Sequence, residues 1–344
     1  MKKYSVAVVG ATGAVGEEIF RVLEEVDFPV GNLLPLASSR SAGNIAEFRG
    51  KGYEIVQLTD SVFEENEIDI AFFSAGGSIS AHFAPLAAAS GAVVIDNTSH
   101  FRMDPEVPLV VPECNPEDIN LWTNKGIIAN PNCSTIQMVQ VLKPLDDLFG
   151  IERVDVSTYQ ATSGAGKKGM EELILQMQKF FEFKLDECEP SAFKYQIALN
   201  VIPHIDVFLD NDYTKEEMKM VNETQKILHK NIEVSATCVR VPVLRSHSES
   251  ITIKFKTDIN VEKALNVLKN APSIVIQDDP ANNLYPMPIL ASDTNETYVG
   301  RIRKDNYRDD ILHLWCVADQ IRVGAATNAV RIAQKWCQIQ ELNH

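Results

Sequence analysis

The order of apolar and polar positions in the first half of the chain predicts parallel strands linked by helices. Short apolar runs recur at residues 6–9, 33–37, 68–74, 92–96, 109–111 and 127–129. Between them, residues 16–23 and 79–89 carry apolar side chains at helical spacing. Strands that alternate with helices in this way are typical of a doubly wound α/β sheet, and we expect that fold here.

The pattern changes from Arg153 onward. Alternate positions are apolar from Val154 to Thr158 and from Ile251 to Phe255, which indicates antiparallel strands with one face toward water. Helical patterns return at residues 168–183, 214–230, 261–269 and 324–342. We therefore expect a first domain over residues 1–133, completed by a C-terminal helix at 321–344. A second, α+β domain with a mixed, largely antiparallel sheet would cover residues 134–320.

A glycine-rich turn joins the first strand to the first helix. Gly10, Gly13 and Gly16 follow the strand with G-x-x-G-x-x-G spacing, a variant of the dinucleotide fingerprint. Glycines permit a tight turn and let a pyrophosphate approach the helix N-terminus. Such turns also occur as structure alone, but the strand before and the amphipathic helix after favour a Rossmann nucleotide-binding domain.

The loop after the second strand predicts which dinucleotide binds. Sites that prefer NAD usually place an acidic residue here, against the ribose 2′-hydroxyl. This chain instead has Ser38, Ser39 and Arg40, whose hydroxyls and guanidinium suit a 2′-phosphate. We predict NADP as the cofactor, and the alternative is an arginine in a solvated polar loop.

The stretch that best predicts chemistry follows the apolar run at 127–129. Asn130-Pro131-Asn132 ends that strand, because proline cannot donate to a sheet ladder, and helical spacing begins at Ile136. Cys133 lies between strand and helix, where free N–H groups and the helix dipole lower a thiol pKa. A buried structural cysteine is the alternative, but this context favours a nucleophile.

Polar side chains of the second domain could assist such a nucleophile. Gln160 ends a predicted strand, where it could orient a reacting group. Arg240 suits a carboxylate, and His247 suits general acid–base work beside a thiolate. Glu216 and Lys219 lie one helical turn apart, a spacing that an exposed ion pair would ordinarily explain.

Two further candidates precede and follow that domain. Arg102 comes after a predicted strand and suits an anion, although a surface salt bridge would also explain it. Asn328 opens the last helix and can hydrogen-bond a carboxamide such as that of nicotinamide.

Composition narrows the class of protein. The 344 residues are 45% hydrophobic with a mean hydropathy of −0.08, and the net charge of −15 argues against nucleic-acid and anionic-membrane partners. The first apolar run is too short for a signal segment or a membrane span. Six cysteines without CxxC pairs indicate reduced thiols and no metal site. We expect a cytoplasmic protein.

Taken in order, these stretches resemble the aspartate-β-semialdehyde dehydrogenase family along essentially the whole chain. The matching motifs are GATGAVG, SSRSAG, DNTSHFRMD, NPNCST, YQATSGAGKKG, NVIPHID, EEMK, CVRVPVLRSHSES and GAATNA. The resemblance implies interconversion of L-aspartate-4-semialdehyde and L-4-aspartyl phosphate with NADP and phosphate, in lysine (diaminopimelate), threonine, methionine and isoleucine biosynthesis. It also implies a homodimer, which in some members assembles further into a tetramer.

The resemblance also implies a role for each candidate residue. In catalysis, Cys133 would be the nucleophile, His247 the acid–base group and Gln160 the residue that positions the acyl-enzyme. For substrate, Arg240 would bind the carboxylate and Glu216, or its neighbour Glu217, the amino group. The phosphate site would comprise Asn132, Arg102 and Lys219. NADP would contact Gly10, Thr12, Gly13, Ala14, Val15, Gly16, Ser39, Arg40, Ser163, Gly164 and Asn328.

Two kinds of alternative share parts of this pattern. N-acetylglutamyl-phosphate reductase and phosphorylating dehydrogenases of the glyceraldehyde-phosphate type would share the thiol and the nucleotide fold. Glu216 separates them, because an acetylated amine has no charge to pair with. A non-catalytic NADP-sensing regulator is the alternative of another class, and the joint presence of Cys133, Gln160, Arg240 and His247 argues against it.

Overall fold

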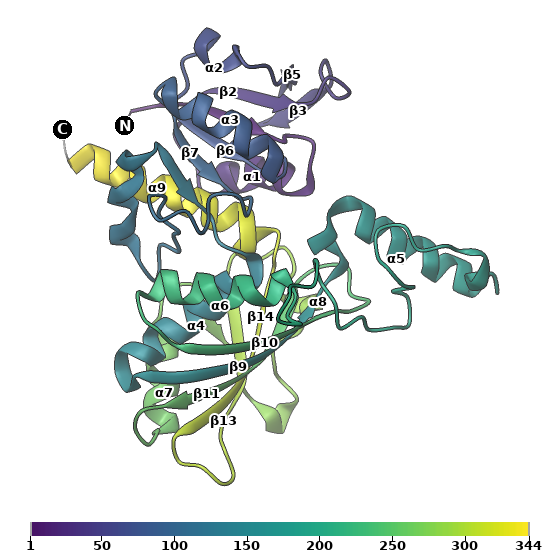
Figure 1. The fold of residues 1–344 in the computed structure, drawn as a ribbon, viewed down its shortest axis with the longest axis vertical. Helices are drawn as coiled ribbons and strands as arrows, with labels where there is room; N and C mark the ends of the chain where they lie inside the picture. Colours follow the sequence, from purple (N-terminus) through teal and green to yellow (C-terminus); the bar gives the residue numbers. More distant parts are fainter. Residues whose placement is uncertain (1, 343–344) are drawn as a thin grey trace. The chain divides into compact units, whose positions relative to one another are not determined.

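The computed structural model describes residues 2–342, which divide into two compact units (Figure 1). The first unit takes the chain up to Asn132 and again from Ala325, so a segment from each end of the sequence belongs to it. The second unit is the continuous stretch Cys133–Gly324. Among the described residues, no helix combines the length and apolar character needed to cross a bilayer.

The first unit is built on a parallel sheet in the order β5-β2-β1-β6-β7-β8. Its strands are β1 (Tyr4–Val9), β2 (Val30–Ala37), β5 (Val56–Gln57), β6 (Ile70–Phe73), β7 (Val93–Asp96) and β8 (Ile127–Ala129). Its helices are α1 (Ala14–Glu25), α2 (Val62–Glu65), α3 (Gly77–Ala89), the 3₁₀ segment η1 (Pro116–Asn124) and α9 (Thr327–Leu342). A separate hairpin pairs β3 (Ile45–Phe48) with β4 (Lys51–Glu54). The expected doubly wound architecture is confirmed.

Residues 109–111 were expected to form a strand, and the structure corrects this prediction. Leu109 forms only one isolated bridge, with Ala129, and the segment does not continue as a strand. The Asn115 side chain takes the place of a neighbouring strand, because it accepts from the Val111 N–H and donates to the Leu109 carbonyl, both at 2.9 Å. Apolar character predicted the burial of this segment correctly but not its hydrogen-bond partner.

The second unit is built on a mixed sheet in the order β10-β9-β11-β14-β13-β12. Its strands are β9 (Ile151–Gln160), β10 (Glu233–Arg240), β11 (His247–Phe255), β12 (Ile274–Ile276), β13 (Thr297–Lys304) and β14 (Ile311–Ala318). The pairs β9–β11, β11–β14 and β14–β13 are antiparallel, whereas β10–β9 and β12–β13 are parallel. The expected mixed sheet is therefore confirmed.

Helices α4 (Cys133–Phe149), α6 (Lys215–Leu228) and α7 (Val261–Asn270) form a layer against this sheet (Figure 1). Inward side chains of β11 alternate with partly exposed ones, and His247, Glu249 and Ile251 are among the buried set.

The remaining helical segments are η2 (Thr162–Ala165), α5 (Gly166–Phe181), η3 (Leu185–Glu187), η4 (Pro280–Asn282), α8 (Pro288–Ala291) and the π-turn η5 (Arg322–Ala326). The sequence did not predict β10, β12, β13 or β14.

Candidate active site

Three of the candidate residues lie side by side at the end of the second unit's sheet. Arg240 and Gln160 are register partners on β10 and β9. On β11, Ser248 pairs with Tyr159, so His247 lies beside Gln160. Paired residues point to the same face of a sheet, and all three side chains are buried on the helix-covered face. We call Arg240, Gln160 and His247 the end row.

A second row lies immediately behind it, two residues further along each strand. Cys238 pairs with Thr158, Thr158 with Glu249, and Glu249 with Cys316. All four of these side chains are fully buried. We call them the inner row. The rows touch through Thr158, whose hydroxyl donates to Gln160 Oε1 at 3.1 Å and so fixes which end of the amide faces α6.

Gln160 connects the end row to a chain of charged groups on α6. Its Nε2 donates to Glu216 Oε1 at 3.0 Å, and Glu216 Oε2 accepts from Lys219 at 2.9 Å. Lys219 also donates to Asp206 at 2.9 Å. Burial opposes the charge of Lys219, but the two carboxylates outweigh it and raise the pKa of the ammonium. The Glu216–Lys219 pair is therefore a mostly buried ion pair linked to Gln160, and the exposed ion pair considered above is ruled out.

The structure also separates Glu216 from Glu217. Glu217 Oε2 accepts from the Thr214 N–H at 2.7 Å, and the Thr214 hydroxyl accepts from the Glu217 N–H, which forms a capping box at the start of α6. Glu217 Oε1 accepts from the Cys238 N–H on β10. Glu217 thus anchors the helix to the sheet, and Glu216 is the carboxylate that meets Gln160.

His247 is held as a neutral imidazole. The Ala161 N–H donates to its Nδ1 at 3.0 Å, so Nδ1 is an acceptor and the ring hydrogen belongs on Nε2. Nε2 is buried and has no partner among the described residues. Burial, and then the positive charge of Arg240, lower the pKa of His247 to about 3. The site therefore presents an N–H donor that awaits an acceptor.

Arg240 is a buried cation, and within residues 2–342 its guanidinium makes one hydrogen bond, so most of its donors remain available there. One guanidinium N–H donates to the Ala161 carbonyl at 2.6 Å, and the group lies over the Phe193 ring at 5.7 Å. Burial lowers the pKa of Arg240, while the negative charges of Glu216 and of Cys133 oppose that effect. A Cβ on Gly164 would lie 2.8 Å from the Arg240 guanidinium and 3.3 Å from the His247 ring, so only glycine fits between them.

Cys133 is the first residue of α4 and is partly exposed. A Cβ on Gly324 would lie 2.5 Å from the Cys133 Cβ, so a glycine is required there. Two other cysteines of the unit differ sharply. Cys238 and Cys316 are fully buried, and burial raises the pKa of each thiol. Position at a helix start, with Arg240 near enough to feel its charge, singles out Cys133.

The glycine turn of the first unit has the close packing that a nucleotide site needs. Gly10 has φ +90°, and a Cβ on Gly16 would lie 2.2 Å from the Gly10 carbonyl oxygen. Thr12, Gly13, Ala14 and Val15 complete the turn into α1. After β2, Ser39 and Arg40 are exposed, and Arg40 pairs with no group in the described part of the chain.

Asn328 carries an orphaned acceptor near the start of α9. Its Nδ2 donates to the Val110 carbonyl at 3.0 Å and to Asn130 Oδ1 at 2.7 Å. Its Oδ1 is buried without a partner among residues 2–342. A buried carbonyl oxygen in that state costs free energy unless a ligand donates to it, which fits a carboxamide.

Arg102 is buried and bound to the loops that precede Cys133 in the sequence. Its Nε donates to the Asn130 carbonyl and its Nη2 to the Asn97 carbonyl, both at 2.9 Å. Arg102 is therefore a buried residue and not a surface one. Asn132 is also buried. Both residues belong to the first unit, while Ser163 and Gly164 belong to η2 of the second, where Ser163 accepts from Gln320.

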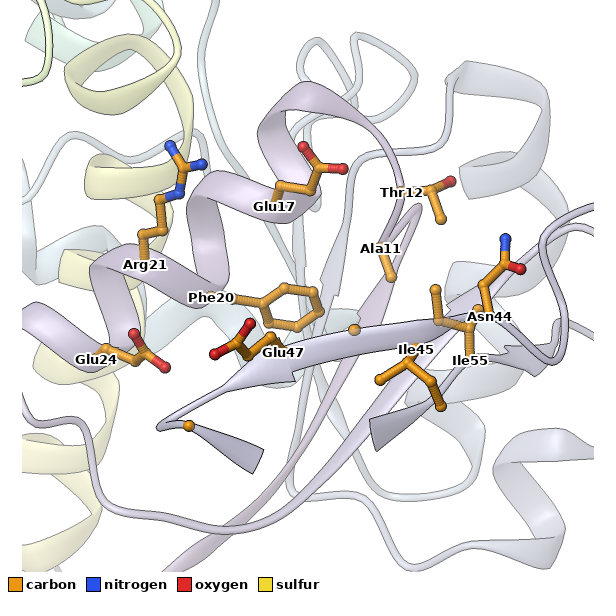
Figure 2. Close-up of a pocket in the computed structure, with 12 residues that line it drawn as sticks. Ala11, Thr12, Glu17, Phe20, Arg21, Glu24, Asn44, Ile45, Glu47 and Ile55 are labelled. Carbon is orange, nitrogen blue, oxygen red and sulfur yellow. The ribbon is translucent and has the colours of Figure 1, made fainter. Parts of the chain in front are cut away.

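A cavity of about 650 Å³ lies beside the glycine turn, between α1 and the β3–β4 hairpin (Figure 2). Ala11 and Thr12 reach one end of it, and Phe20 and Ile55 contribute apolar surface. Its charged lining residues are Glu17, Arg21, Glu24 and Glu47. Three carboxylates against one cation make this cavity unsuited to a phosphate group.

Sequence reasoning missed three functional candidates that the second unit brings to the site. Thr158 orients Gln160, Asp206 holds Lys219, and Phe193 covers Arg240. Asp206 lies within the NVIPHID motif, which was used for its resemblance and given no role. Thr158 and Phe193 looked like ordinary strand and loop residues, and only the register and the folded loop reveal them.

The chain has a Rossmann-type unit and a second unit whose sheet brings together an imidazole, an amide and a guanidinium, and this plan fits a dehydrogenase. Family models agree with this class. Residues 5–122 match the model described as semialdehyde dehydrogenase, NAD binding domain, and residues 142–323 match semialdehyde dehydrogenase, dimerisation domain.

Relatives narrow the class further. The aspartate-semialdehyde dehydrogenase of Campylobacter jejuni is 71% identical, covering 98% of this chain and 99% of its own length. Aspartate semialdehyde dehydrogenase II of Vibrio cholerae, complexed with ASA, has a TM-score of 0.94 at 47% identity, covering 98% of this chain and 99% of the other. The NADP complex from Candida albicans has a TM-score of 0.74 at 26% identity, with 97% and 98% covered. The chain belongs to the aspartate-semialdehyde dehydrogenase family and is an oxidoreductase, which confirms the resemblance.

Proposed function

We propose that the protein interconverts L-aspartate-4-semialdehyde and L-4-aspartyl phosphate, with NADP as the hydride carrier and phosphate as co-substrate. The observation that carries the proposal is the end row, which gathers Arg240, Gln160 and His247 on one face of three neighbouring strands. Glu216 joins this group through Gln160. An anion holder, a proton donor and a carboxylate are thus assembled in one place.

The substrate is an amino acid aldehyde with a carboxylate and an ammonium group. Arg240 has donors left for the carboxylate, and its planar fork suits bidentate binding. Glu216 would hold the ammonium, because Glu217 is fully committed to the capping box and to the Cys238 N–H. An N-acetylated substrate would leave Glu216 without that partner, which argues against the acetylglutamyl-phosphate alternative.

Cys133 would form the covalent intermediate. Its thiolate adds to the aldehyde carbon, and the carbonyl oxygen becomes an alkoxide that accepts from the His247 Nε2–H. Oxidation of this thiohemiacetal gives a thioester, and attack by phosphate oxygen on the thioester carbon releases the thiolate and forms the acyl phosphate. Because His247 is neutral with its hydrogen on Nε2, it serves here as a donor to the alkoxide.

NADP fits the residues of the first unit. The glycine turn from Gly10 to Gly16 would hold the pyrophosphate, Ser39 and Arg40 the 2′-phosphate, and the orphaned Oδ1 of Asn328 the carboxamide N–H groups. Ser163 and Gly164 are further candidates. When bound, the nicotinamide supplies the acceptor for the hydride. The exposed, unpaired guanidinium of Arg40 is the feature that favours NADP over NAD.

Lys219, Arg102 and Asn132 would form the phosphate site. Lys219 keeps its charge because Glu216 and Asp206 raise its pKa. Arg102 is fixed by two backbone carbonyls, so its orientation does not depend on a ligand.

We also propose a homodimer built through the second unit, and place the enzyme in the cytoplasm in lysine, threonine, methionine and isoleucine biosynthesis. Exposed apolar side chains support the dimer. They cluster along α5 and the segment after it, at Ile174, Leu175, Phe180, Phe181, Phe183, Tyr195, Leu199, Val201, Val207 and Phe208. A patch of this kind on a chain of ordinary composition marks an interface. Phe181→Glu should lower the molar mass measured by light scattering.

The test of the reaction is the nicotinamide absorbance on mixing the protein with L-aspartate-4-semialdehyde and NADP⁺. We expect reduction that requires phosphate, that is weaker with NAD⁺, and that fails with the N-acetylated aldehyde. Arg40→Ala should remove most of the preference for NADP. Equal rates with and without phosphate would contradict the acyl-transfer step. Activity only with the N-acetylated aldehyde would indicate an N-acetylglutamyl-phosphate reductase instead.

A further inference from the structure

A cavity of about 240 Å³ adjoins Arg240 within the second unit. It is lined by Arg240 of β10, by Ala165 of η2 and by the loop between α5 and α6. The lining residues used below are Arg240, Phe193, Ile202, His204 and Asp206. The loop is rigidly held, because Gln176 Oε1 on α5 accepts from the N–H groups of Ile197 and Ala198, both at 2.9 Å.

The loop places His204 next to Arg240. Ile202 and Arg240 exchange two backbone hydrogen bonds, at 2.9 and 2.8 Å, so the chain two residues later lies beside the guanidinium. The His204 ring stacks on Phe208, with centroids 4.4 Å apart and planes 14° apart, which fixes its orientation. Its Nε2 is buried and has no partner among the described residues.

An orphaned, buried ring nitrogen calls for a ligand. Leaving such a group unpaired costs free energy, and a bound acceptor would recover that cost. Arg240 commits one N–H to the Ala161 carbonyl and faces the same cavity with the rest of its fork. Two donors on one cavity suit the two oxygens of a carboxylate.

The opposite charge on the cavity wall narrows the ligand. Asp206 lines the cavity and is bound to Lys219, which in turn binds Glu216. Lys194 also lines the cavity, so its wall carries charges of both signs, and an amino acid zwitterion can direct its ammonium toward Asp206 and its carboxylate toward Arg240.

We propose that His204 is a substrate-binding residue that completes, with Arg240, the subsite for the α-carboxylate. The His204 Nε2–H donates to one carboxylate oxygen, and Arg240 donates to the other. Phe193 and Phe208 hold the two donors from behind, so the carboxylate meets a preformed pair. This inference rests on the proposed function, since it assigns a group of the proposed substrate to the cavity.

The test compares His204→Phe, which keeps a ring to stack on Phe208, with His204→Gln, whose amide nitrogen can replace Nε2. The probe is L-2-aminobutyrate, which carries the carboxylate and the ammonium without a reactive aldehyde, and its Kd is measured by calorimetry. We expect His204→Phe to weaken binding by about tenfold or more and His204→Gln by no more than about threefold. His204→Leu replaces the phenylalanine variant if its melting temperature shows that it does not fold.

Kinetics give a second readout. His204→Phe should raise the KM for L-aspartate-4-semialdehyde with little change in kcat, because the lost contact is uniform binding. With 3-aminopropanal, which lacks the carboxylate, wild type and variant should have the same kcat/KM. A Kd for His204→Phe within twofold of wild type, or no binding of L-2-aminobutyrate to wild type, would overturn the inference. Binding that depends on His204 without turnover would instead refute the proposed reaction and leave this subsite standing.

Discussion

The end row and the inner row of the second unit contain similar chemical groups two residues apart, yet only one can meet a substrate. The end row has a cation, an amide and an imidazole, and its free donors face an open cavity or an unfilled position. The inner row has two thiols, a hydroxyl and a carboxyl group that are sealed between sheet and helices. The two rows differ in how far they lie from the ends of the strands, and this difference decides which row a substrate can reach.

The difference shows how burial alone changes the chemistry of one residue type. Cys316 and Glu249 are register partners in the inner row, and burial raises the pKa of both, so each stays protonated. Glu216, in contact with Lys219 and Gln160, has the partners that an ionised carboxylate requires. Cys133, the proposed nucleophile, lies at the start of α4, outside the inner row.

Replacing the thiol at the helix start should have the largest effect. Cys133→Ser should lower kcat by at least about 10³-fold, because a hydroxyl is a weaker nucleophile and its ester a poorer acyl donor than a thioester. Circular dichroism and the melting temperature should match wild type. Cys316→Ala is the matched control in the inner row and should keep kcat within about threefold. Near-normal turnover by Cys133→Ser would sink the covalent assignment.

Changing the end-row cation should have the next largest effect. Arg240→Lys keeps the charge but loses the planar fork and the stacking on Phe193. We expect the KM for L-aspartate-4-semialdehyde to rise by about 10- to 100-fold, while the Kd of NADP, measured by fluorescence, stays unchanged. Equal losses of aldehyde and NADP affinity would mean that the substitution disturbs the whole fold and would remove the subsite assignment.

The neutral state of His247 in the end row should be visible in the pH dependence of the free energy of unfolding. Its folded pKa of about 3 lies below the ordinary value of 6.5, so the unfolded chain binds the extra proton first. The stability that the neutral ring contributes is complete above pH 6.5 and is lost as the pH falls toward 3. Between pH 6.5 and 5 this amounts to about 2 kcal/mol of the free energy of unfolding.

Urea unfolding at the two pH values measures this loss. His247→Gln cannot take up the proton, so the variant should lose less stability over the same interval. In wild type, kcat/KM should show no inflection from His247 between pH 6 and 8, because the ring is already neutral there. An identical stability loss in wild type and His247→Gln would show that the ring is not held in the neutral form.

The sequence predicted the end row better than its surroundings for a physical reason. Cys133 and Gln160 were predicted at a helix start and a strand end, where proline, glycine and polar residues make the boundary visible, whereas the strand that ends at Arg240 was not predicted. Which of these ends meet depends on strand order and register, which local pattern cannot supply. The pairing of Arg240 with Gln160 is therefore a result of the fold.

The sequence analysis missed the inner row because polar residues in this part of the chain suggest exposure to water and not burial. The polar residues near the start of β11, Ser248, Glu249 and Ser250, suggest a solvent-exposed segment. The apolar alternation is visible only from Ile251. The structure extends the buried phase of that alternation back through Glu249 to His247. Tertiary packing overrides polarity here, and the strand period of two explains which positions it overrides.

Replacing Glu249 should have the smallest effect of these substitutions, and it tests most directly whether the inner row is buried in a neutral state. Burial raises its pKa well above 4.5, so the neutral acid contributes stability that is complete below about pH 4.5 and is lost as the pH rises. Glu249→Gln keeps the shape and stays neutral at every pH. We expect a melting temperature a few degrees above wild type at pH 8, a smaller gain at pH 5, and kcat within about threefold of wild type. A lower melting temperature at pH 8 would mean that Glu249 is ionised and paired, and the two rows would then differ in access to substrate but not in charge.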